Sequence, residues 1–173
     1  GCVYVFGAQK GVKEEEKESM DRAMQSYAAC LEKFTGKKLS EIPGTGAAGG
    51  LGFAFLWGLP NVELKPGIDI VLEAVGLTNE LKDADVVVTG EGCLDFQTAM
   101  GKVPVGVAKT AKNYNCKVIA FAGSVTEEAK NCNEKGIDAF FSILPGVCSL
   151  DEAMNTETAQ KNMRNAAEQV FRL

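Results

Sequence analysis

The sequence predicts an α/β fold built on a parallel sheet. Three short apolar runs at residues 86–88, 118–122 and 139–144 alternate with amphipathic helical segments. Continuous β-branched runs are typical of parallel strands that are buried on both faces, and the intervening helices serve as crossover connections. With right-handed crossovers, this order gives a Rossmann-like βαβαβα unit.

The residues before this unit predict an α/β segment that belongs to a second domain. Residues 2–6 are apolar and predict a strand that stops at Gly7. Residues 13–34 predict a helix that ends at Gly36. Its apolar stripe consists of Met20, Met24, Tyr27, Leu31 and Phe34, at spacings of four and three residues.

Glycine is concentrated in the middle of the chain, with five glycines in the nine positions 44–52. Such a density indicates backbone freedom or the close approach of a ligand. Residues 53–57 then predict a short buried helix. Pro66 begins a further helix, which Gly76 ends.

Helices are predicted at residues 102–113, 126–135 and 156–172, and Ser149 with Glu152 forms a capping-box pattern. Three strands make a thin sheet with open edges. We therefore expect further strands from elsewhere in a longer protein, or association with a second copy to give a homodimer.

Charge and composition exclude several functions. Lys plus Arg is 18 and Asp plus Glu is 23, which gives 18 − 23 = −5, so binding to nucleic acid is not expected. The chain contains no histidine, which excludes a histidine base, a Ser-His-Asp triad and any zinc site with a histidine ligand.

The six cysteines form no CxxC pair, and we expect six free thiols in a cytoplasmic protein. The longest apolar run, residues 51–59, is much shorter than the roughly 20 residues that span a bilayer, so no membrane partner is expected.

The most informative polar residues follow the first strand of the sheet. In open α/β folds, ligands bind beyond the carboxyl ends of the strands. They are Glu91, which lies in a predicted loop between two glycines, then Asp95, Gln97, Thr98 and Lys102. Carboxylates, a hydroxyl and an ammonium near a helix N-terminus can hold Mg²⁺ and position phosphates. The alternative is an exposed Glu91, a helix-capping Asp95 and a surface Lys102.

The glycine-rich loop contains a GxGxxG pattern at residues 44–49, with Glu63 at the spacing of a dinucleotide fingerprint. The preceding residues 37–43 end in Pro43 and make a poor core strand. The pattern therefore favours an anion-binding loop, although an NAD-dependent dehydrogenase remains an alternative. The loop's candidate binding residues are Gly44, Thr45, Gly46, Gly49 and Gly50.

Several segments together resemble the glycerate kinase family. The most specific is TGEGCLDFQTAMGK at residues 89–102, and the glycine-rich segment 43–52 is also similar. Further matching segments are residues 5–11, 65–68, 120–124 and 136–142. The resemblance runs over nearly the whole chain in the family's order.

The resemblance implies phosphoryl transfer from MgATP to D-glycerate to give 2-phosphoglycerate. It implies that Glu91 and Asp95 hold Mg²⁺ or orient the hydroxyl, and that Lys102 contacts a phosphate or the substrate carboxylate. Gln97 and Thr98 are expected beside them in the phosphate- and substrate-binding set. Gln9 and Lys10 are candidates for the glycerate carboxylate.

The resemblance also implies an enzyme about twice this long, with two α/β domains. Residues 1–66 are then the end of one domain and residues 67–173 half of the other. The N-terminal half is expected to be missing, and the chain alone is expected to be inactive. Cys93 and Ala8 stand where the family usually has Arg and Pro. A non-catalytic α/β module, or a kinase remnant whose Cys93 marks loss of function, is therefore a further alternative.

Overall fold

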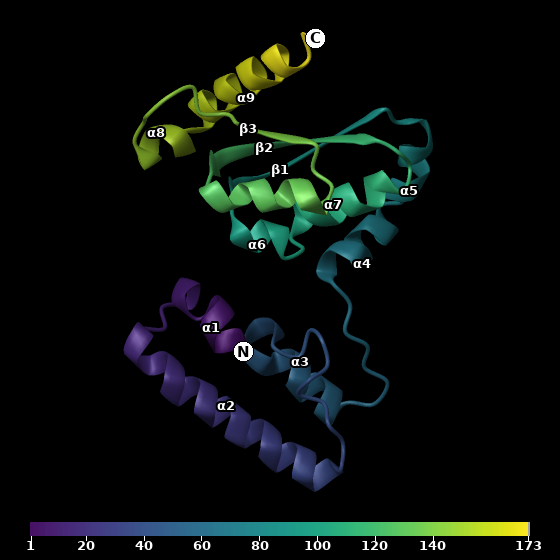
Figure 1. The fold of residues 1–173 in the computed structure, drawn as a ribbon, viewed down its shortest axis with the longest axis vertical. Coiled ribbons are helices and arrows are strands. Elements are labelled where there is room, and N and C mark those ends of the chain that lie inside the picture. The colour runs from purple at the N-terminus through teal and green to yellow at the C-terminus, as the bar shows by residue number, and fades with distance from the viewer. Residues whose placement is uncertain (173) are drawn as a thin grey trace. The chain divides into compact units, whose positions relative to one another are not determined.

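The computed structural model describes residues 1–172. The chain divides into two compact units, Gly1–Pro66 and Gly67–Leu173, and each is described by itself. The first unit contains only helices and turns among the described residues, and the second contains a sheet with helices (Figure 1). Their assignment to two domains of a longer protein stays a prediction.

The second unit contains a sheet of three parallel strands, as predicted. These are β1 (Val86–Leu94), β2 (Lys117–Val125) and β3 (Ala139–Ser142), in the order β1-β2-β3. Val87 of β1 is in register with Val118 of β2, and Ile119 with Ala139 of β3. The α/β fold class is therefore confirmed.

Helices lie on both faces of this sheet (Figure 1). The helices of the second unit are α4 (Gly67–Ala74), α5 (Leu77–Glu80), η2 (Leu81–Asp83), α6 (Phe96–Ala99), α7 (Val103–Lys112), η3 (Glu127–Lys135), α8 (Leu150–Met154) and α9 (Thr156–Val170). The elements α6, α7 and η3 cover one face, and α8 and α9 lie on the other side. The fully buried core lies between α7 and the sheet. It includes Val105 and Ala108 of α7 and Leu94, Val118 and Ala120 of the strands.

The first strand is longer than the sequence predicts. The predicted strand covered residues 86–88, but β1 continues to Leu94, and Glu91 pairs with Ala122 of β2. Gly90 makes this extension possible, because an added Cβ atom at this position would lie 2.3 Å from the carbonyl oxygen of Phe121. Glu91 is thus a strand residue, and the prediction that it lies in a loop was wrong.

Burial of the sheet on both faces was also predicted, and one face is open instead. Val86 is 41% exposed, Val88 51% and Phe141 39%. The opposite face carries the side chains that pack under α7, such as Val118 and Ala120, which are fully buried. The prediction that the apolar runs form strands is confirmed. The described residues, however, bury only one face of the sheet completely.

The predicted helix at residues 126–135 is a 3₁₀ helix, η3. Ala129 and Cys132, its two buried residues, are three positions apart. In a 3₁₀ helix, residues i and i+3 lie directly above one another, so this geometry directs both side chains into the core. The other residues of η3 are polar, so the segment has no apolar stripe with the period of an α-helix.

The prediction of a strand at residues 2–6 was wrong, because these residues form α1 (Cys2–Phe6). The described residues of the first unit contain no strand, so an extended segment at residues 2–6 would leave its backbone groups without partners. The N–H of Gly7 instead donates to the carbonyl of Val3 at 2.9 Å. The short turn η1 (Ala8–Lys10) follows.

The two longer helices of the first unit are α2 (Glu14–Thr35) and α3 (Ala47–Gly58). The apolar stripe of α2 is largely uncovered, since none of its residues is buried. Its clearest contact is made by Tyr27, whose ring meets that of Phe53 on α3 edge to face, with 6.1 Å between centroids. The first turn of α3 is kinked, with positive φ at Ala48, Gly49 and Gly50.

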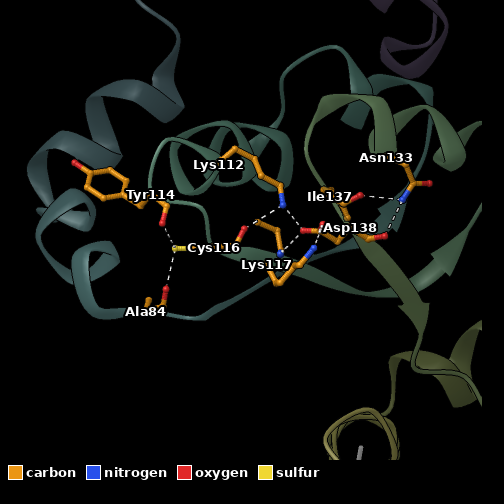
Figure 2. Close-up of polar contacts among 9 residues, drawn as sticks. Ala84, Lys112, Tyr114, Cys116, Lys117, Asn133, Ile137 and Asp138 are labelled. Atoms are coloured by element: carbon orange, nitrogen blue, oxygen red, sulfur yellow. Dashed lines mark hydrogen bonds and ion pairs between the residues drawn. The ribbon is translucent and has the colours of Figure 1, made fainter.

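At the amino ends of the strands, Asp138 joins β2 to the end of α7 (Figure 2). Its carboxylate accepts the N–H of Val118 at 2.7 Å and a hydrogen bond from the Lys112 ammonium. Lys117 adds an ion pair at 3.5 Å. The bond from Lys112 lowers the pKa of Asp138, burial opposes this, and the Val118 N–H lowers it further. This cluster lies at the end of the sheet away from the polar residues that follow β1.

We expect Asp138→Asn to lower the free energy of unfolding by about 1–2 kcal/mol at pH 7, because a charged acceptor is lost from a partly exposed site. A lowered carboxyl pKa contributes stability above the unfolded value of about 3.9, and this contribution is lost as the pH falls through the folded value. The difference from wild type should therefore shrink in acid. Urea unfolding at pH 7 and pH 3, with exposed Asp83→Asn as control, tests this. An Asp138→Asn protein as stable as wild type at pH 7 would contradict it.

Candidate functional site

The candidate site is built on the carboxyl-terminal half of β1 and the turn that follows it. Glu91 is held in the strand by its pairing with Ala122. Asp95 comes directly after β1 and is the N-cap of α6, where its carboxylate accepts the N–H of Thr98 at 3.0 Å. The strand thus fixes Glu91, and the N-cap of the short helix fixes Asp95, four positions further along the chain.

Thr98 connects the two carboxylates. It is fully buried, and its hydroxyl donates to Oε1 of Glu91. The hydroxyl oxygen of Thr98 also lies 3.2 Å from Oδ1 of Asp95, and it accepts a hydrogen bond from the backbone N–H of Asp95 at 3.2 Å. Because a hydroxyl has one proton, it can donate to only one carboxylate at a time. Thr98 therefore holds Glu91 and Asp95 in one hydrogen-bonded group.

Lys102 completes this group as the N-cap residue of α7. Its ammonium lies 3.5 Å from Oδ1 of Asp95, and its side chain is 41% exposed. Burial raises the pKa of Asp95, but the Thr98 N–H and the charge of Lys102 outweigh it, so this pKa lies below its usual range. Asp95 is therefore ionised at neutral pH, and Lys102 can reach a ligand from the solvent side.

Cys132 of η3 is fully buried. Burial raises the pKa of its thiol, and the charges of Glu91 and Asp95 raise it further. The thiol therefore remains protonated and inert at neutral pH. All six cysteines are unpaired in the structure.

The other predicted residues of the second unit are less closely tied to this group. Gln97 lies in α6, half-buried. Cys93 is half-buried at the end of β1, with its sulfur 3.9 Å from the carbonyl oxygen of Leu94. The structure thus brings four of the predicted residues into contact: Glu91, Asp95, Thr98 and Lys102.

The remaining predicted residues lie in the first unit and are described there. Gln9 and Lys10 are exposed on η1. Thr45 is buried, and its hydroxyl oxygen lies 2.8 Å from the carbonyl oxygen of Ile42 and 3.1 Å from that of Ser40, so its one proton is donated within the turn before α3. Thr45 therefore presents no free hydroxyl to a ligand in this conformation.

The glycines at 46, 49 and 50 border a cavity of about 830 Å³ between α2 and α3. The charged side chains in its lining are the carboxylates of Asp21, Glu32 and Glu41. Three carboxylates do not favour an anion on this side of the loop. The anion-binding role predicted for Gly44–Gly50 stays a prediction.

The structure also shows a cavity that the sequence did not predict, which we name the α8 cavity. It measures about 620 Å³. One side is formed by Gly90–Gly92 of β1 and Phe121–Ser124 of β2, and the other by α8 and Met163 of α9. The capping box at Ser149 was a usable signal, because it places a short helix just beyond the carboxyl ends of the strands.

The donor set of Glu91 and Asp95 is compatible with a magnesium ion that has further ligands. Mg²⁺ commonly binds one or two protein carboxylates and completes its shell with water and phosphate oxygens. Glu91 and Asp95 supply two such carboxylates. Among residues 1–172, no group of three or more acidic, cysteine or histidine side chains could form a metal site without other ligands.

No helix in the part of the chain that the structure describes has the length and apolar character needed to cross a membrane.

Comparison with known proteins identifies the class to which this fold and site belong. The model of the glycerate kinase family matches residues 1–173. The chain therefore belongs to the glycerate kinase family, and the resemblance carried by residues 89–102 is confirmed.

Individual relatives agree with this assignment. The chain is 44% identical over 170 residues to a glycerate kinase of Bacillus subtilis, covering 98% of this chain and 44% of the relative. It is 42% identical over 153 residues to a glycerate 2-kinase of Escherichia coli, covering 88% and 40%. A crystal structure described as a candidate glycerate kinase 2 from Salmonella typhimurium LT2 matches with a TM-score of 0.57 and 38% identity. That match covers all of this chain and 46% of the other. The chain thus spans less than half the length of these relatives.

Proposed function

We propose that this chain is part of an enzyme that transfers the γ-phosphoryl group of ATP to D-glycerate to give 2-phosphoglycerate. The observation that carries the proposal is the contact of Glu91 and Asp95 through Thr98, with Lys102 paired to Asp95. Membership of the glycerate kinase family supports the substrate and ATP. The name of the Escherichia coli relative, glycerate 2-kinase, supports phosphorylation at the second carbon.

Each member of the group has a role that its geometry supports. Glu91 lies toward the carboxyl end of β1, where its side chain can orient the hydroxyl of glycerate. Asp95 is held ionised by Thr98 and Lys102, so it keeps a negative charge ready at neutral pH. Lys102, whose side chain is 41% exposed, can contact a phosphate or the substrate carboxylate. Thr98, which is fully buried, positions the two carboxylates.

Mg²⁺ is the cofactor that this arrangement fits, with Glu91 and Asp95 as its protein ligands. When bound, it supplies positive charge that offsets the negative charge of the phosphates. Positioning and electrostatics account for most of the rate enhancement in phosphoryl transfer, so the absence of histidine is no obstacle.

The dehydrogenase alternative finds no support in the geometry. A dinucleotide fingerprint requires a strand immediately before the glycines. In the described first unit, the residues before Gly44 form turns, and α2 is the element that precedes them. Phosphorylation of glycerate by the full-length protein would exclude the alternative of a non-catalytic module.

We further propose that the active, cytoplasmic enzyme contains a preceding half in addition to this chain. The six free thiols support a reducing compartment. The open face of the sheet, with Val86, Val88 and Phe141 exposed, supports a cover that is either the preceding half or a second copy of the chain.

From this proposal we expect the 173-residue chain alone to bind nucleotide weakly and to show no turnover. In-line transfer requires both substrates to be held in a defined geometry, and on this proposal part of the cleft belongs to the preceding half. A coupled assay of glycerate-dependent ADP release, run in parallel on the chain and on the full-length protein, measures this. Turnover by the chain at the full-length rate would mean that residues 1–173 contain a complete active site.

A further inference from the structure

A packing contact between α4 and α7 lies close to Lys102 and has no part in the candidate site described above. Lys102 is the N-cap residue of α7, and α4 packs against that helix. The contact includes Ile68 of α4, which lies over Gly106 of α7. A Cβ atom added at Gly106 would lie 2.4 Å from Cγ1 of Ile68 and 2.9 Å from its Cγ2. The Ile68 side chain therefore occupies the space that a larger residue at position 106 would need.

Gly106 is hydrogen-bonded directly to the backbone of Lys102. The N–H of Gly106 donates to the carbonyl of Lys102 at 3.0 Å. The N–H of Lys102 donates in turn to the carbonyl of Thr98 at 3.3 Å. The backbone of Lys102 is thus held between Gly106, which Ile68 covers, and Thr98, which connects the two carboxylates of the site.

Ile68 is well suited to fix the first turn of α7, because its side chain is stiff. A residue that is branched at Cβ has one strongly preferred rotamer in a helix. Leu72, one turn further along α4, is only 8% exposed, so it anchors the helix that carries Ile68. Because a packed interior leaves few voids, a shift of α4 at this contact moves Gly106 as well.

We infer that Ile68 is a positioning residue for Lys102 and acts through Gly106. The inference rests on the proposed function, in which Lys102 contacts a phosphate or the substrate carboxylate. The Lys102 ammonium lies 3.5 Å from Oδ1 of Asp95, and its side chain is 41% exposed. The contact of α4 with α7 sets the place from which this side chain starts, and so the place where its ammonium meets the ligand.

The first test is the KM of the full-length enzyme for ATP and for glycerate. Ile68→Ala should raise the KM of the same substrate that Lys102→Met affects, by about tenfold, because displacements of an ångström are costly in such sites. Its kcat should change less. Ile70→Ala is the matched control, since Ile70 lies on the same helix and is 52% exposed, and both of its KM values should equal those of wild type.

A double-mutant cycle separates positioning from a general loss of stability. Two residues that act through the same interaction give non-additive effects when both are changed. In the Lys102→Met protein, Ile68→Ala should therefore cause little further change in KM. A variant that merely lowered the amount of folded enzyme would lower the apparent kcat and leave KM unchanged.

Gly106→Ala approaches the same contact from α7, so the question is decided even if Ile68→Ala does not fold. The new Cβ atom presses on the γ carbons of Ile68 and should raise the same KM. In the double variant Ile68→Ala/Gly106→Ala, both γ carbons are absent, and Cβ of residue 68 lies 3.2 Å from the added atom. We expect this double variant to recover most of the affinity that Gly106→Ala loses.

Acetylation of lysines by acetic anhydride, followed by peptide mass spectrometry, examines Lys102 without the reaction. In Ile68→Ala, Lys102 is held less firmly beside Asp95. Its acetylation should become about two to five times faster, the range expected when a partly exposed ion pair is weakened. Lys109, an exposed lysine of the same helix, is the internal control and should react at the wild-type rate.

The outcomes separate this inference from the proposed function. In an enzyme that phosphorylates glycerate, wild-type KM values for Ile68→Ala and Gly106→Ala overturn the positioning role and leave the kinase intact. A full effect of Ile68→Ala in the Lys102→Met protein does the same. If the protein does not phosphorylate glycerate, the proposed function fails and acetylation decides. Faster acetylation of Lys102 then supports the positioning role, and an unchanged rate overturns it.

Discussion

Glu91→Gln in the full-length enzyme should lower kcat by about 10²–10³, the usual cost of losing one group directed at the transition state. Glutamine keeps the shape of the side chain, and its amide oxygen still accepts the hydrogen bond from the Thr98 hydroxyl. The connection between residue 91 and Asp95 through Thr98 is therefore kept. What is lost is the negative charge at the carboxyl end of β1. Steady-state kinetics at saturating ATP and glycerate, with a Mg²⁺ titration, measure the effect.

Glu127→Gln is the matched control. Glu127 begins η3 and forms only an exposed ion pair with Lys130 at 3.4 Å, which contributes little. We expect its kcat to equal that of wild type. If Glu91→Gln also kept the wild-type kcat and Mg²⁺ dependence, the role assigned to Glu91 would be wrong.

Gly90→Ala should destabilise the protein by about 3 kcal/mol, because overpacking a well-packed interior costs amounts of this order. The new Cβ atom would lie 2.3 Å from the carbonyl oxygen of Phe121, which is backbone of the paired strand. Relief of this contact requires β1 and β2 to separate at the point where Glu91 is held. The midpoint of urea unfolding, followed by circular dichroism, measures the loss.

Gly92→Ala provides the comparison within the same strand. An added Cβ atom at Gly92 meets no atom within 4 Å, so its unfolding midpoint should stay near that of wild type. Equal stability of the two variants would show that the approach of Phe121 to Gly90 does not limit the packing of the sheet.

The sequence predicts the second unit well because its signals are local. The apolar run at residues 118–122 lies within β2, and the helix predicted at 102–113 is α7. The contact of Asp95 with Thr98 is a capping interaction three residues long, so residues 89–102 bring the candidate site together without distant segments.

What the sequence does not predict depends on partners far along the chain. The extension of β1 through Gly90 and Gly92 arises from pairing with β2, and strand propensity alone does not favour glycine. Residues 2–6 are apolar enough for a strand, yet they form α1 because the described first unit offers no strand to pair with. The α8 cavity combines β1, β2, α8 and α9, which no local pattern connects.

The most direct test of the account is to identify the product formed by the full-length enzyme from ATP, Mg²⁺ and D-glycerate. Phosphorus NMR of the reaction, with and without glycerate, reports both transfer and the carbon that receives the phosphate. The account predicts ADP formation that depends on glycerate, with the phosphate on the second carbon. Absence of glycerate-dependent ADP, or phosphate on the third carbon, would contradict it.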